Sequence, residues 1–237
     1  MSERTVVIDC AAERTPRYDA SQAVVVIDVI RATTTAITSV ASGRRCFAAR
    51  GVEEAKAVAC TLEHAILAGE VDGVMPEEFE LRNSPAVVAA FPDVQRPLVL
   101  VSTSGTPLMS AFEPNQTYVA ALRNYRAQSA YLAANHPHVA LVGAGSRGTF
   151  REEDALCCAW VARLLIDAGH RPLGKTQMHV ERWRDATPDA ILESASVEYL
   201  RRSDQLDDLT FILEHVDDLD TVYAIDGREV VGVNGKR

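Results

Sequence analysis

The chain has 237 residues, of which 47% are hydrophobic, and a formal net charge of −9. Such an acidic chain lacks the basic surface that binding to nucleic acid or to an anionic membrane needs, and no apolar run approaches the roughly 18 residues of a membrane span. A small anionic substrate is not excluded, because a few local arginines can outweigh the net charge nearby.

Eight apolar segments predict β-strands, and several are continuous apolar runs, as in strands that are covered on both faces of a sheet. In chain order these segments are 5–9, 23–29, 45–50, 97–102, 117–122, 138–143, 221–226 and 229–233. Helical patterns lie between them at 33–41, 52–67, 84–90, 123–134, 151–167 and 188–216, the last as one or two amphipathic helices.

This alternation of strands and helices predicts a three-layer α/β/α sandwich with a mainly parallel sheet. Asp226-Gly227-Arg228 joins the last two strands and is typical of a hairpin turn, so we expect a mixed sheet with this C-terminal hairpin as its antiparallel edge. No fixed-period repeat or Pro/Ser-rich linker divides the chain. Residues 1–237 are therefore expected to form a single domain.

The five cysteines are an odd number and include no Cys-x-x-Cys pair, which indicates reduced thiols rather than a disulfide framework or a zinc site. The N-terminal stretch MSERTVVIDC has no basic segment followed by a long apolar core, so no signal peptide is expected. Together these features predict a cytoplasmic protein.

The stretch VIDVIRATTT (26–35) places Asp28, Arg31 and three threonines where a core strand ends. Arginine matches the shape of a phosphate or carboxylate, and the free N–H groups at a helix start favour an anion. Because Asp28 would repel that anion, a divalent metal between them would resolve the conflict. The alternative is plainer: Asp28 pairs with Arg31, and a threonine caps the helix.

A short Ser/Thr/Gly loop, STSGTP at 102–107, follows another predicted strand. The backbone N–H groups of such a loop can approach an oxyanion closely. An ordinary Ser/Thr turn with a helix cap is the alternative.

The stretch GAGSRG at 143–148 matches Gly-x-Gly-x-x-Gly between a predicted strand and a predicted helix, the setting of a dinucleotide-binding turn. The next helix, however, opens with Glu152, Glu153 and Asp154, where a pyrophosphate should sit. These three acids also have a structural explanation, because acidic residues in a first helical turn complement the helix dipole.

The connection at 67–85 carries five acidic residues before Asn83-Ser84-Pro85, and glycines bracket Glu70 and Asp72. A carboxylate flanked by glycine can reach a metal from a loop, and a solvated acidic loop is the alternative. Phosphate-friendly loops and isolated carboxylates thus recur at three predicted strand ends and in one connection. This composition favours metal-assisted phosphate chemistry, and no Gly-x-Ser-x-Gly elbow supports a serine hydrolase.

Four stretches together resemble the 2-phosphosulfolactate phosphatase (ComB-like) family, and the resemblance extends over nearly the whole chain. They are DVIRATTT (28–35), GEVDGVMPEEFELRNSP (69–85), TSGT (103–106) and AGSRGTFREEDALCCA (144–159), followed by ESASVEYL (193–200) and the final hairpin. The resemblance implies a magnesium-dependent phosphatase that converts 2-phospho-3-sulfolactate to sulfolactate and phosphate in the coenzyme M pathway. A homo-oligomer is compatible with it.

From the residues and the resemblance together, we expect Asp28, Glu70 and Asp154 to bind Mg²⁺, and Asp28 and Arg31 to be catalytic. A second group is expected to contact the phosphoryl group or another part of a small anionic phosphate ester. This group comprises Thr33, Thr34, Asn83, Ser104, Gly105, Thr106 and Gly145.

The chain departs from the family pattern in the loops that are expected to contact substrate. Val71 stands where the family commonly has an arginine, and Ser104 stands where it has an asparagine. Arg82 replaces a glycine and Arg151 a serine, so these two arginines are candidates for the cation that Val71 does not supply. Such changes also allow a second hypothesis, a non-catalytic binding protein for a phosphorylated or sulfonated metabolite. A third, a nucleotide-linked oxidoreductase, rests only on the glycines at 143–148.

Overall fold

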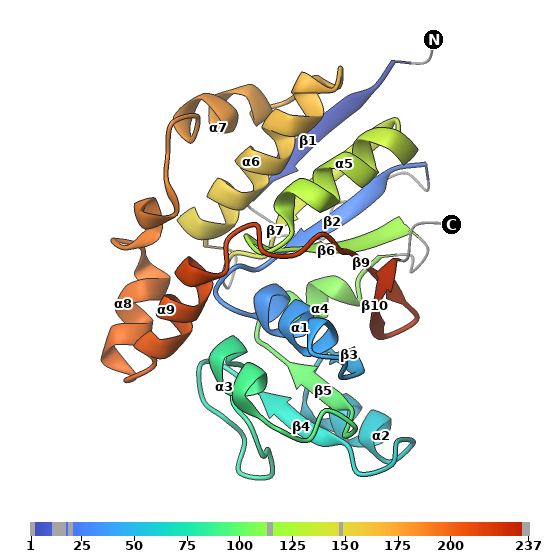
Figure 1. Ribbon diagram of the computed structural model, residues 1–237, viewed down its shortest axis with the longest axis vertical. Helices are drawn as coiled ribbons and strands as arrows, with labels where there is room; N and C mark the ends of the chain where they lie inside the picture. Colours follow the sequence, from blue (N-terminus) through green and yellow to red (C-terminus); the bar gives the residue numbers. More distant parts are fainter. Residues whose placement is uncertain (1–2, 11–17, 19–20, 113–115, 147–148, 234–237) are drawn as a thin grey trace.

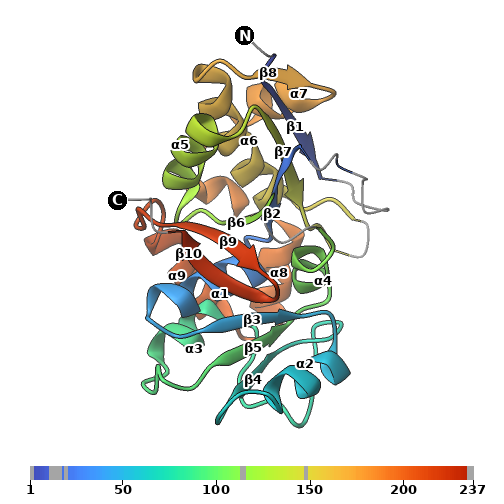
Figure 2. The ribbon, with the colours of Figure 1, turned by 90° about the vertical axis from the view of Figure 1, so that its right-hand side faces the viewer.

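The computed structural model describes residues 3–10, 18, 21–112, 116–146 and 149–233. In these residues a central sheet is covered by helices on both of its faces (Figures 1 and 2). The strands are β1 (Thr5–Asp9), β2 (Ala23–Ile27), β3 (Cys46–Ala49), β4 (Ile66–Gly69), β5 (Leu98–Val101), β6 (Thr117–Ala120), β7 (His138–Gly143), β8 (Arg171–Leu173), β9 (Val222–Asp226) and β10 (Glu229–Val233). The α-helices are α1 (Ala32–Ala41), α2 (Val52–Ala59), α3 (Pro85–Ala90), α4 (Gly105–Met109), α5 (Tyr125–Asn135), α6 (Glu152–Asp167), α7 (Thr176–Arg182), α8 (Ala195–Arg202) and α9 (Leu206–Glu214).

Two parallel blocks of strands make up this sheet, and the C-terminal hairpin joins them. In the described residues the strand order is β4-β5-β3-β10-β9-β6-β2-β7-β1-β8. Pairing is parallel within β4-β5-β3 and within β6-β2-β7-β1-β8, and antiparallel at the three junctions that involve β9 and β10. The expected mixed α/β sheet with a C-terminal hairpin is therefore confirmed, although the hairpin lies in the middle of the sheet and not at its edge.

The accumulated twist of the sheet lets both blocks contribute to one site. Figure 2 shows β3 and β5 lying across the direction of β1 and β2, as the right-handed twist between neighbouring strands predicts when it adds up over many strands. Loops that follow strands of the two blocks can therefore approach each other, even though the three antiparallel junctions reverse the strand direction between the blocks.

The side chains of β2 alternate between two cores, which accounts for the three layers. Val25 and Ile27 pack with buried residues of α5 and α6, whereas Val24 and Val26 pack with α1 and α4. Both sets are almost completely buried, as expected for a parallel strand that helices cover on both faces. In the other block, the residues of β3 and β5 that face away from α1 pack against α2.

Several predicted elements need correction. The helical pattern at 52–67 ends at Ala59, and β4 begins at Ile66, after a turn in which His64 has a positive φ of 51°. The region 188–216 holds a 3₁₀ turn (Pro188–Ile191) followed by α8 and α9. The strand β8 and the helix α7 were not predicted, because each is too short to show a period. That residues 1–237 form a single domain stays a prediction.

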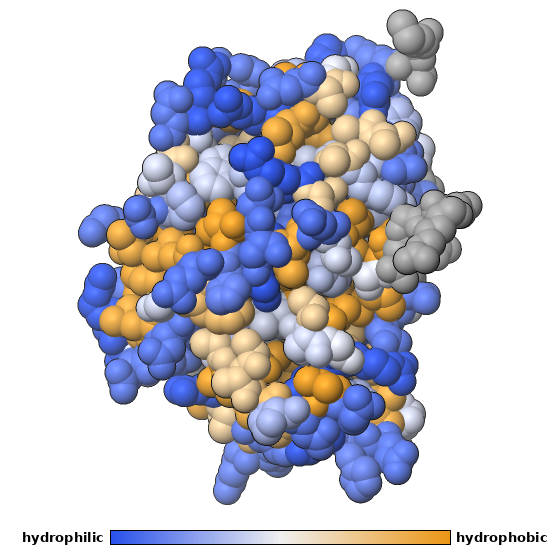
Figure 3. Space-filling view, viewed as in Figure 1, coloured by the Kyte–Doolittle hydropathy of each residue, from blue (hydrophilic) through white to orange (hydrophobic). Residues whose placement is uncertain are grey.

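The surface seen in Figure 3 is mixed, with apolar side chains gathered over α8 and α9 among polar ones. Leu192 and Leu206 are exposed there. Within the described ranges, no helix has both the length and the apolar character needed to cross a bilayer. All five cysteines are free, as the reading of the sequence expects.

Candidate active site

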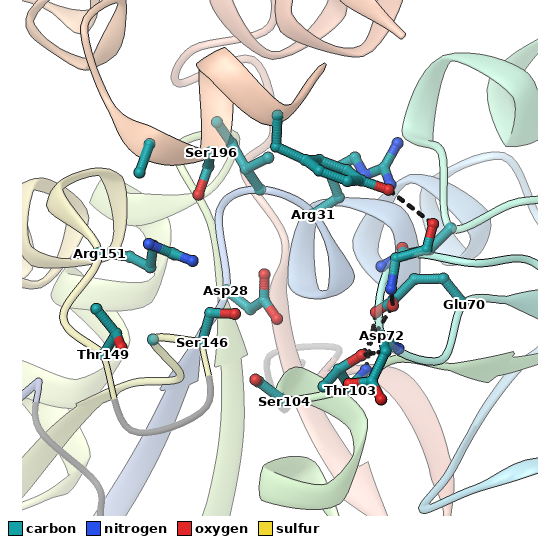
Figure 4. Close-up of a pocket in the computed structure, with 16 residues that line it drawn as sticks. Asp28, Arg31, Glu70, Asp72, Thr103, Ser104, Ser146, Thr149, Arg151 and Ser196 are labelled. Atoms are coloured by element: carbon teal, nitrogen blue, oxygen red, sulfur yellow. Dashed lines mark hydrogen bonds between the residues drawn. The ribbon is translucent and has the colours of Figure 1, made fainter. Parts of the chain in front are cut away.

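A cavity of about 340 Å³ lies where the loops after β2, β4, β5 and β7 meet the first turn of α8 (Figure 4). Six of its lining residues were predicted from the sequence: Asp28, Arg31, Glu70, Asn83, Ser104 and Gly145. Arg151, a candidate for the cation that Val71 does not supply, also lines it, and five others that matter below were not assigned to the site: Thr103, Ser146, Thr149, Ser196 and Tyr199. The carboxyl ends of parallel strands are the usual ligand sites of open α/β sheets, and the cavity follows that rule.

Asp28 lies at the centre of this cavity (Figure 4) and is held by the backbone of α1. The N–H of Ala32 donates to its Oδ1 at 3.1 Å, whereas Oδ2 accepts no hydrogen bond from the described residues. Only 7% of Asp28 is exposed. Burial raises its pKa to about 7, and the nearby carboxylates of Glu153 and Glu70 add to the rise. A buried carboxylate with a free oxygen and a raised pKa is a site that a cation would stabilise.

The threonines after Asp28 fold the loop and do not line the cavity. The Thr33 hydroxyl accepts a hydrogen bond from the Asp28 N–H at 3.0 Å and donates to the Asp28 carbonyl at 2.8 Å. The Thr34 hydroxyl donates to the carbonyl of Val29 at 2.8 Å. Both side chains are buried. The geometry therefore gives Thr33 and Thr34 the role of fixing Asp28, and does not support the expected contact with a phosphoryl group.

Arg31 lines the cavity. The plainer interpretation of the sequence expected it to pair with Asp28, but it forms its ion pair elsewhere. Its Nη1 donates to Asp208 of α9 at 2.6 Å and to Gln205 at 2.5 Å. Asp208 is buried and also accepts hydrogen bonds from the Ser84 hydroxyl and the Ala86 N–H. The charge of Arg31 is thus largely compensated within the protein, and its orientation is fixed by a helix far away in the sequence.

Glu70 organises the loops that follow β4 and β5. Its Oε1 accepts a hydrogen bond from the Thr103 N–H at 2.8 Å, and its Oε2 accepts from the Thr103 hydroxyl and from the Gly73 N–H. The carbonyl of Gly73 in turn accepts from the hydroxyl of Tyr199 in α8 at 2.7 Å. Glu70 and Tyr199 therefore hold one wall of the cavity in place, and both still line it.

Asp154 likewise holds two loops together, at the opposite wall of the cavity. Its two oxygens accept hydrogen bonds from the N–H groups of Val29, at 2.8 Å, and of Gly145, at 3.0 Å. Burial and the carboxylates of Asp28 and Glu153 raise its pKa well above the ordinary range. Because it is buried, lies outside the lining and has both oxygens engaged, Asp154 does not fit the expected role of a direct metal ligand.

Of the expected Ser104-Gly105-Thr106 cradle, only Ser104 lines the cavity. Thr106 is buried, and its hydroxyl and N–H make reciprocal hydrogen bonds with the N–H and hydroxyl of Ser102. Gly105 lets α4 approach Asp28, since an added Cβ would lie 2.4 Å from the Asp28 Oδ2. Gly105 and Thr106 thus act through packing and loop closure.

Asn83 and Gly145 lie where the sequence placed them. Asn83 lines the cavity and is 3% exposed, and its Oδ1, which is itself buried, has no hydrogen-bond partner among the described residues. Gly145 has a φ of 58°, in the left-handed region that favours glycine. Arg147 and Gly148 of the Gly-x-Gly-x-x-Gly match lie outside the described residues.

The two candidate arginines differ in their position. Arg151 lines the cavity, whereas Arg82 is exposed and lies outside the lining, as does the exposed Val71. Arg151 is also the residue that precedes α6, as Arg31 precedes α1. The first residues of α8 line the cavity as well. The N-terminal ends of these three helices thus meet here, and their dipoles favour an anion.

Comparison with known proteins agrees with this chemistry. A family model described as 2-phosphosulpholactate phosphatase matches residues 10–227. The chain belongs to this family. The family is named for the hydrolysis of a phosphoric monoester, in keeping with the anion-favouring cavity.

Three relatives from this family carry the name "Probable 2-phosphosulfolactate phosphatase". The one from Pseudothermotoga lettingae is 35% identical over 144 residues, which cover 60% of this chain and 62% of that protein. The one from Gloeothece citriformis is 35% identical over 159 residues, 65% of this chain and 66% of that protein. The one from Synechocystis sp. is 30% identical over 210 residues, 84% of this chain and 87% of that protein. The chain thus spans somewhat less than two thirds of the first two relatives.

The cavity residues of this family member fit one Mg²⁺ ion. Among the described residues, no group of three or more His, Cys, Asp or Glu side chains could enclose a metal. Mg²⁺ commonly binds through one or two carboxylates together with waters and substrate phosphate, so an enclosing cage is not needed. Asp28 has a carboxylate oxygen that accepts no hydrogen bond from the described residues, and Glu70 and Asn83 line the same cavity.

Sequence reasoning missed the contribution of α8. Ser196 and Tyr199 lie within ESASVEYL, a stretch that marked the family resemblance but carried no recognisable site motif. Ser194 caps this helix by accepting a hydrogen bond from the Val197 N–H at 3.2 Å. Ser194, as a residue type favoured at N-caps, could have marked the start of α8, but not its place against the loops after β2 and β7.

Proposed function

We propose that this protein is an Mg²⁺-dependent phosphatase that hydrolyses 2-phospho-3-sulfolactate, or a closely related small acidic phosphate ester, to sulfolactate and phosphate. One observation carries the proposal. A protein of net charge −9 brings three helix N-termini, Arg31 and Arg151 to one cavity around a single central carboxylate, Asp28. Membership of the 2-phosphosulpholactate phosphatase family supports phosphate-ester hydrolysis as the reaction at this cavity.

Asp28 anchors the reacting end of the substrate in this proposal. The hydrogen bonds of Ala32 and Thr33 keep its carboxylate directed into the cavity, and Gly105 leaves room beside it. Bound Mg²⁺ would supply electrostatic stabilisation of the charge that develops on the transferring phosphoryl group. Asp28 would hold that ion, and Glu70 and Asn83 are the other residues with side-chain oxygens that line the cavity and could contribute to its binding.

Polar groups of the chain would orient the phosphoryl group beside Asp28. Ser104 and the start of α1 lie next to it, and Arg31 is held rigidly by Asp208, so no reorganisation is needed during the reaction. Arg151 and the residues near it line another part of the cavity, where they could contact the rest of the substrate.

The cellular setting rests on the resemblance and the composition. A cytoplasmic location, a homo-oligomer and a role in making coenzyme M stay predictions. They follow from the reduced cysteines and from the family pattern, and none of them is needed for the chemistry described above.

The experiment that tests the proposal is phosphate release by the purified protein. 2-Phospho-3-sulfolactate, 2-phospholactate and p-nitrophenyl phosphate are each offered with Mg²⁺ and again with EDTA. Metal-dependent release that is fastest with the sulfonate supports the proposal. Folded protein that binds 2-phospho-3-sulfolactate in calorimetry but releases no phosphate would instead be a binding protein.

A further inference from the structure

The cavity has a second polar wall that the proposed phosphoryl chemistry does not use. Figure 4 shows Glu70, Asp72 and Thr103 on one side of Asp28, and Ser146, Thr149 and Arg151 on the other. The first side is acidic and is tied together by the hydrogen bonds of Glu70. The second side presents two hydroxyl groups and a guanidinium, and the hydroxyl of Ser196 faces it from α8 (Figure 4).

Arg151 is the cation of this second wall. Arg31, the other arginine of the cavity, forms a buried ion pair with Asp208. Within the described part of the chain Arg151 forms no ion pair and donates no hydrogen bond. Its neighbour Glu152 forms its ion pair with Arg182. Glu153 is buried, and although burial raises its pKa, the charge of Arg151 acts to lower it without a direct ion pair between the two. A cation that is directed into a cavity without a protein partner is poised for an anionic ligand.

The backbone fixes the position of this wall. The N–H of Ser146 donates to the carbonyl of Thr149 at 2.9 Å, and the N–H of Thr149 donates back to the carbonyl of Ser146 at 2.8 Å. The N–H of Gly145 donates to Asp154, which also binds the loop that carries Asp28. Arg151 follows at once, and α6 begins at Glu152. The backbone that carries Arg151 is therefore held at a set place relative to Asp28.

We propose that Arg151 binds a second oxyanion of the substrate, separate from the phosphoryl group, and thereby selects phosphate esters that carry a carboxylate or a sulfonate. Ser146, Thr149 and Ser196 supply neutral donors around the same group. This inference rests on the proposed function, since it assigns the phosphoryl group to Asp28. It makes Arg151 a specificity-determining residue of this chain.

A series of three secondary phosphate esters, which differ in the number of further anionic groups, tests the inference. Glycerol 2-phosphate has two hydroxymethyl groups, 2-phosphoglycerate has a carboxylate in place of one of them, and 2-phospho-3-sulfolactate has a sulfonate in addition. The Arg151→Gln variant should lower the kcat/KM for 2-phospho-3-sulfolactate about 10- to 100-fold more than that for glycerol 2-phosphate, because a charged hydrogen bond is lost. If the larger loss already appears with 2-phosphoglycerate, Arg151 binds the carboxylate. If it appears only with 2-phospho-3-sulfolactate, Arg151 binds the sulfonate.

Two further variants make the result specific. Arg82→Gln removes the same charge from an exposed arginine outside the cavity, and it should leave the preference among the three esters as in the wild type. Arg151→Lys keeps the charge but not the planar fork, and it should recover part of the preference. Equal losses on all three esters, or no loss on any, would overturn the inference.

Failure of the proposed function has a different signature. If the wild-type protein hydrolyses none of the esters, the phosphatase assignment fails. Calorimetric binding of 2-phospho-3-sulfolactate to the wild type and to Arg151→Gln then decides the inference by itself. Binding that weakens at least about 10-fold in the variant supports a second-oxyanion site, and equal binding overturns it.

Discussion

The guanidinium of Arg31 and the carboxylate of Asp208 lie 2.6 Å apart and form a buried ion pair, although 177 positions separate them in the chain. Asp208 also accepts hydrogen bonds from the Ser84 hydroxyl and the Ala86 N–H, at the start of α3. One carboxylate of α9 thus connects the residue before α1 with the start of α3. Arg31, which lines the cavity, is thereby linked to α3 and α9 through this side chain.

Replacing Asp208 should destabilise the whole protein. In Asp208→Asn the buried guanidinium of Arg31 loses its counter-charge, and breaking a buried pair from one side costs about 3–5 kcal/mol. Urea unfolding measures this loss. Asp207→Asn is the matched control, because Asp207 is exposed on the same helix. A change of under about 0.5 kcal/mol in Asp208→Asn would show that Arg31 does not depend on the pair.

The contact between Gly105 and Asp28 makes a second prediction. An added Cβ at position 105 would lie 2.4 Å from the Asp28 Oδ2 and 2.6 Å from the Cβ of Ala32. Gly105→Ala should therefore displace Asp28, lower kcat about 100-fold, and cost about 1–3 kcal/mol of stability through overpacking. Gly51→Ala is the control, since an added Cβ there meets nothing within 4 Å. Wild-type kcat in Gly105→Ala would contradict the central place given to Asp28.

Glu70→Gln should release the loops after β4 and β5. Its Oε2 accepts hydrogen bonds from the Thr103 hydroxyl and the Gly73 N–H, and an amide nitrogen in that place could not accept them. We expect a loss of about 1–3 kcal/mol and faster hydrogen exchange at the Gly73 and Thr103 amides. Glu77→Gln, in the same connection but exposed, is the control. Unchanged exchange in Glu70→Gln would show that the wall is held by other contacts.

The buried carboxylate of Asp28 predicts how stability depends on pH in metal-free buffer. Its pKa is about 7 in the folded protein, against an ordinary value of 3.8. Between these values the folded state holds a proton that the unfolded state has released. Stability should therefore fall as the pH rises from about 4 to about 7, by up to about 1.4 kcal/mol per pH unit from this group, and level off above it.

Asp28→Asn isolates that contribution. The difference in unfolding free energy between the variant and the wild type should grow in favour of the variant as the pH rises to 7. Mg²⁺ binds the ionised carboxylate, so it should raise the wild-type Tm more at pH 8 than at pH 5. A pH-independent difference between the two proteins would contradict the raised pKa.

The sequence predicted the fold well where structure is local and strongly patterned. The continuous apolar runs of β2, β5 and β7 identified strands that helices cover on both faces. The strand β4 was missed because its four residues follow a helical pattern, and only its pairing with β5 makes Ile66–Gly69 extended. The central position of the hairpin was equally unpredictable, since pairing with β3 and β6 is a long-range property.

The site was predicted in part for the same reason. Strand-end loops carry Asp28, Glu70, Asn83 and Ser104, and these line the cavity as expected. The role of each polar group depends on partners far along the chain. The sequence VIDVIRATTT could not show that Arg31 pairs with Asp208. It also could not show that backbone N–H groups donate to both oxygens of Asp154.

The central claim is that Asp28 holds the Mg²⁺ on which phosphate release depends. The most direct test is phosphate release from 2-phospho-3-sulfolactate by the wild type and by Asp28→Asn, measured across a titration of Mg²⁺ from EDTA-treated protein. The account predicts saturable activation of the wild type and a loss of at least about 100-fold in the variant at every Mg²⁺ concentration. Wild-type turnover in EDTA, or full activity of a folded Asp28→Asn protein, would contradict it.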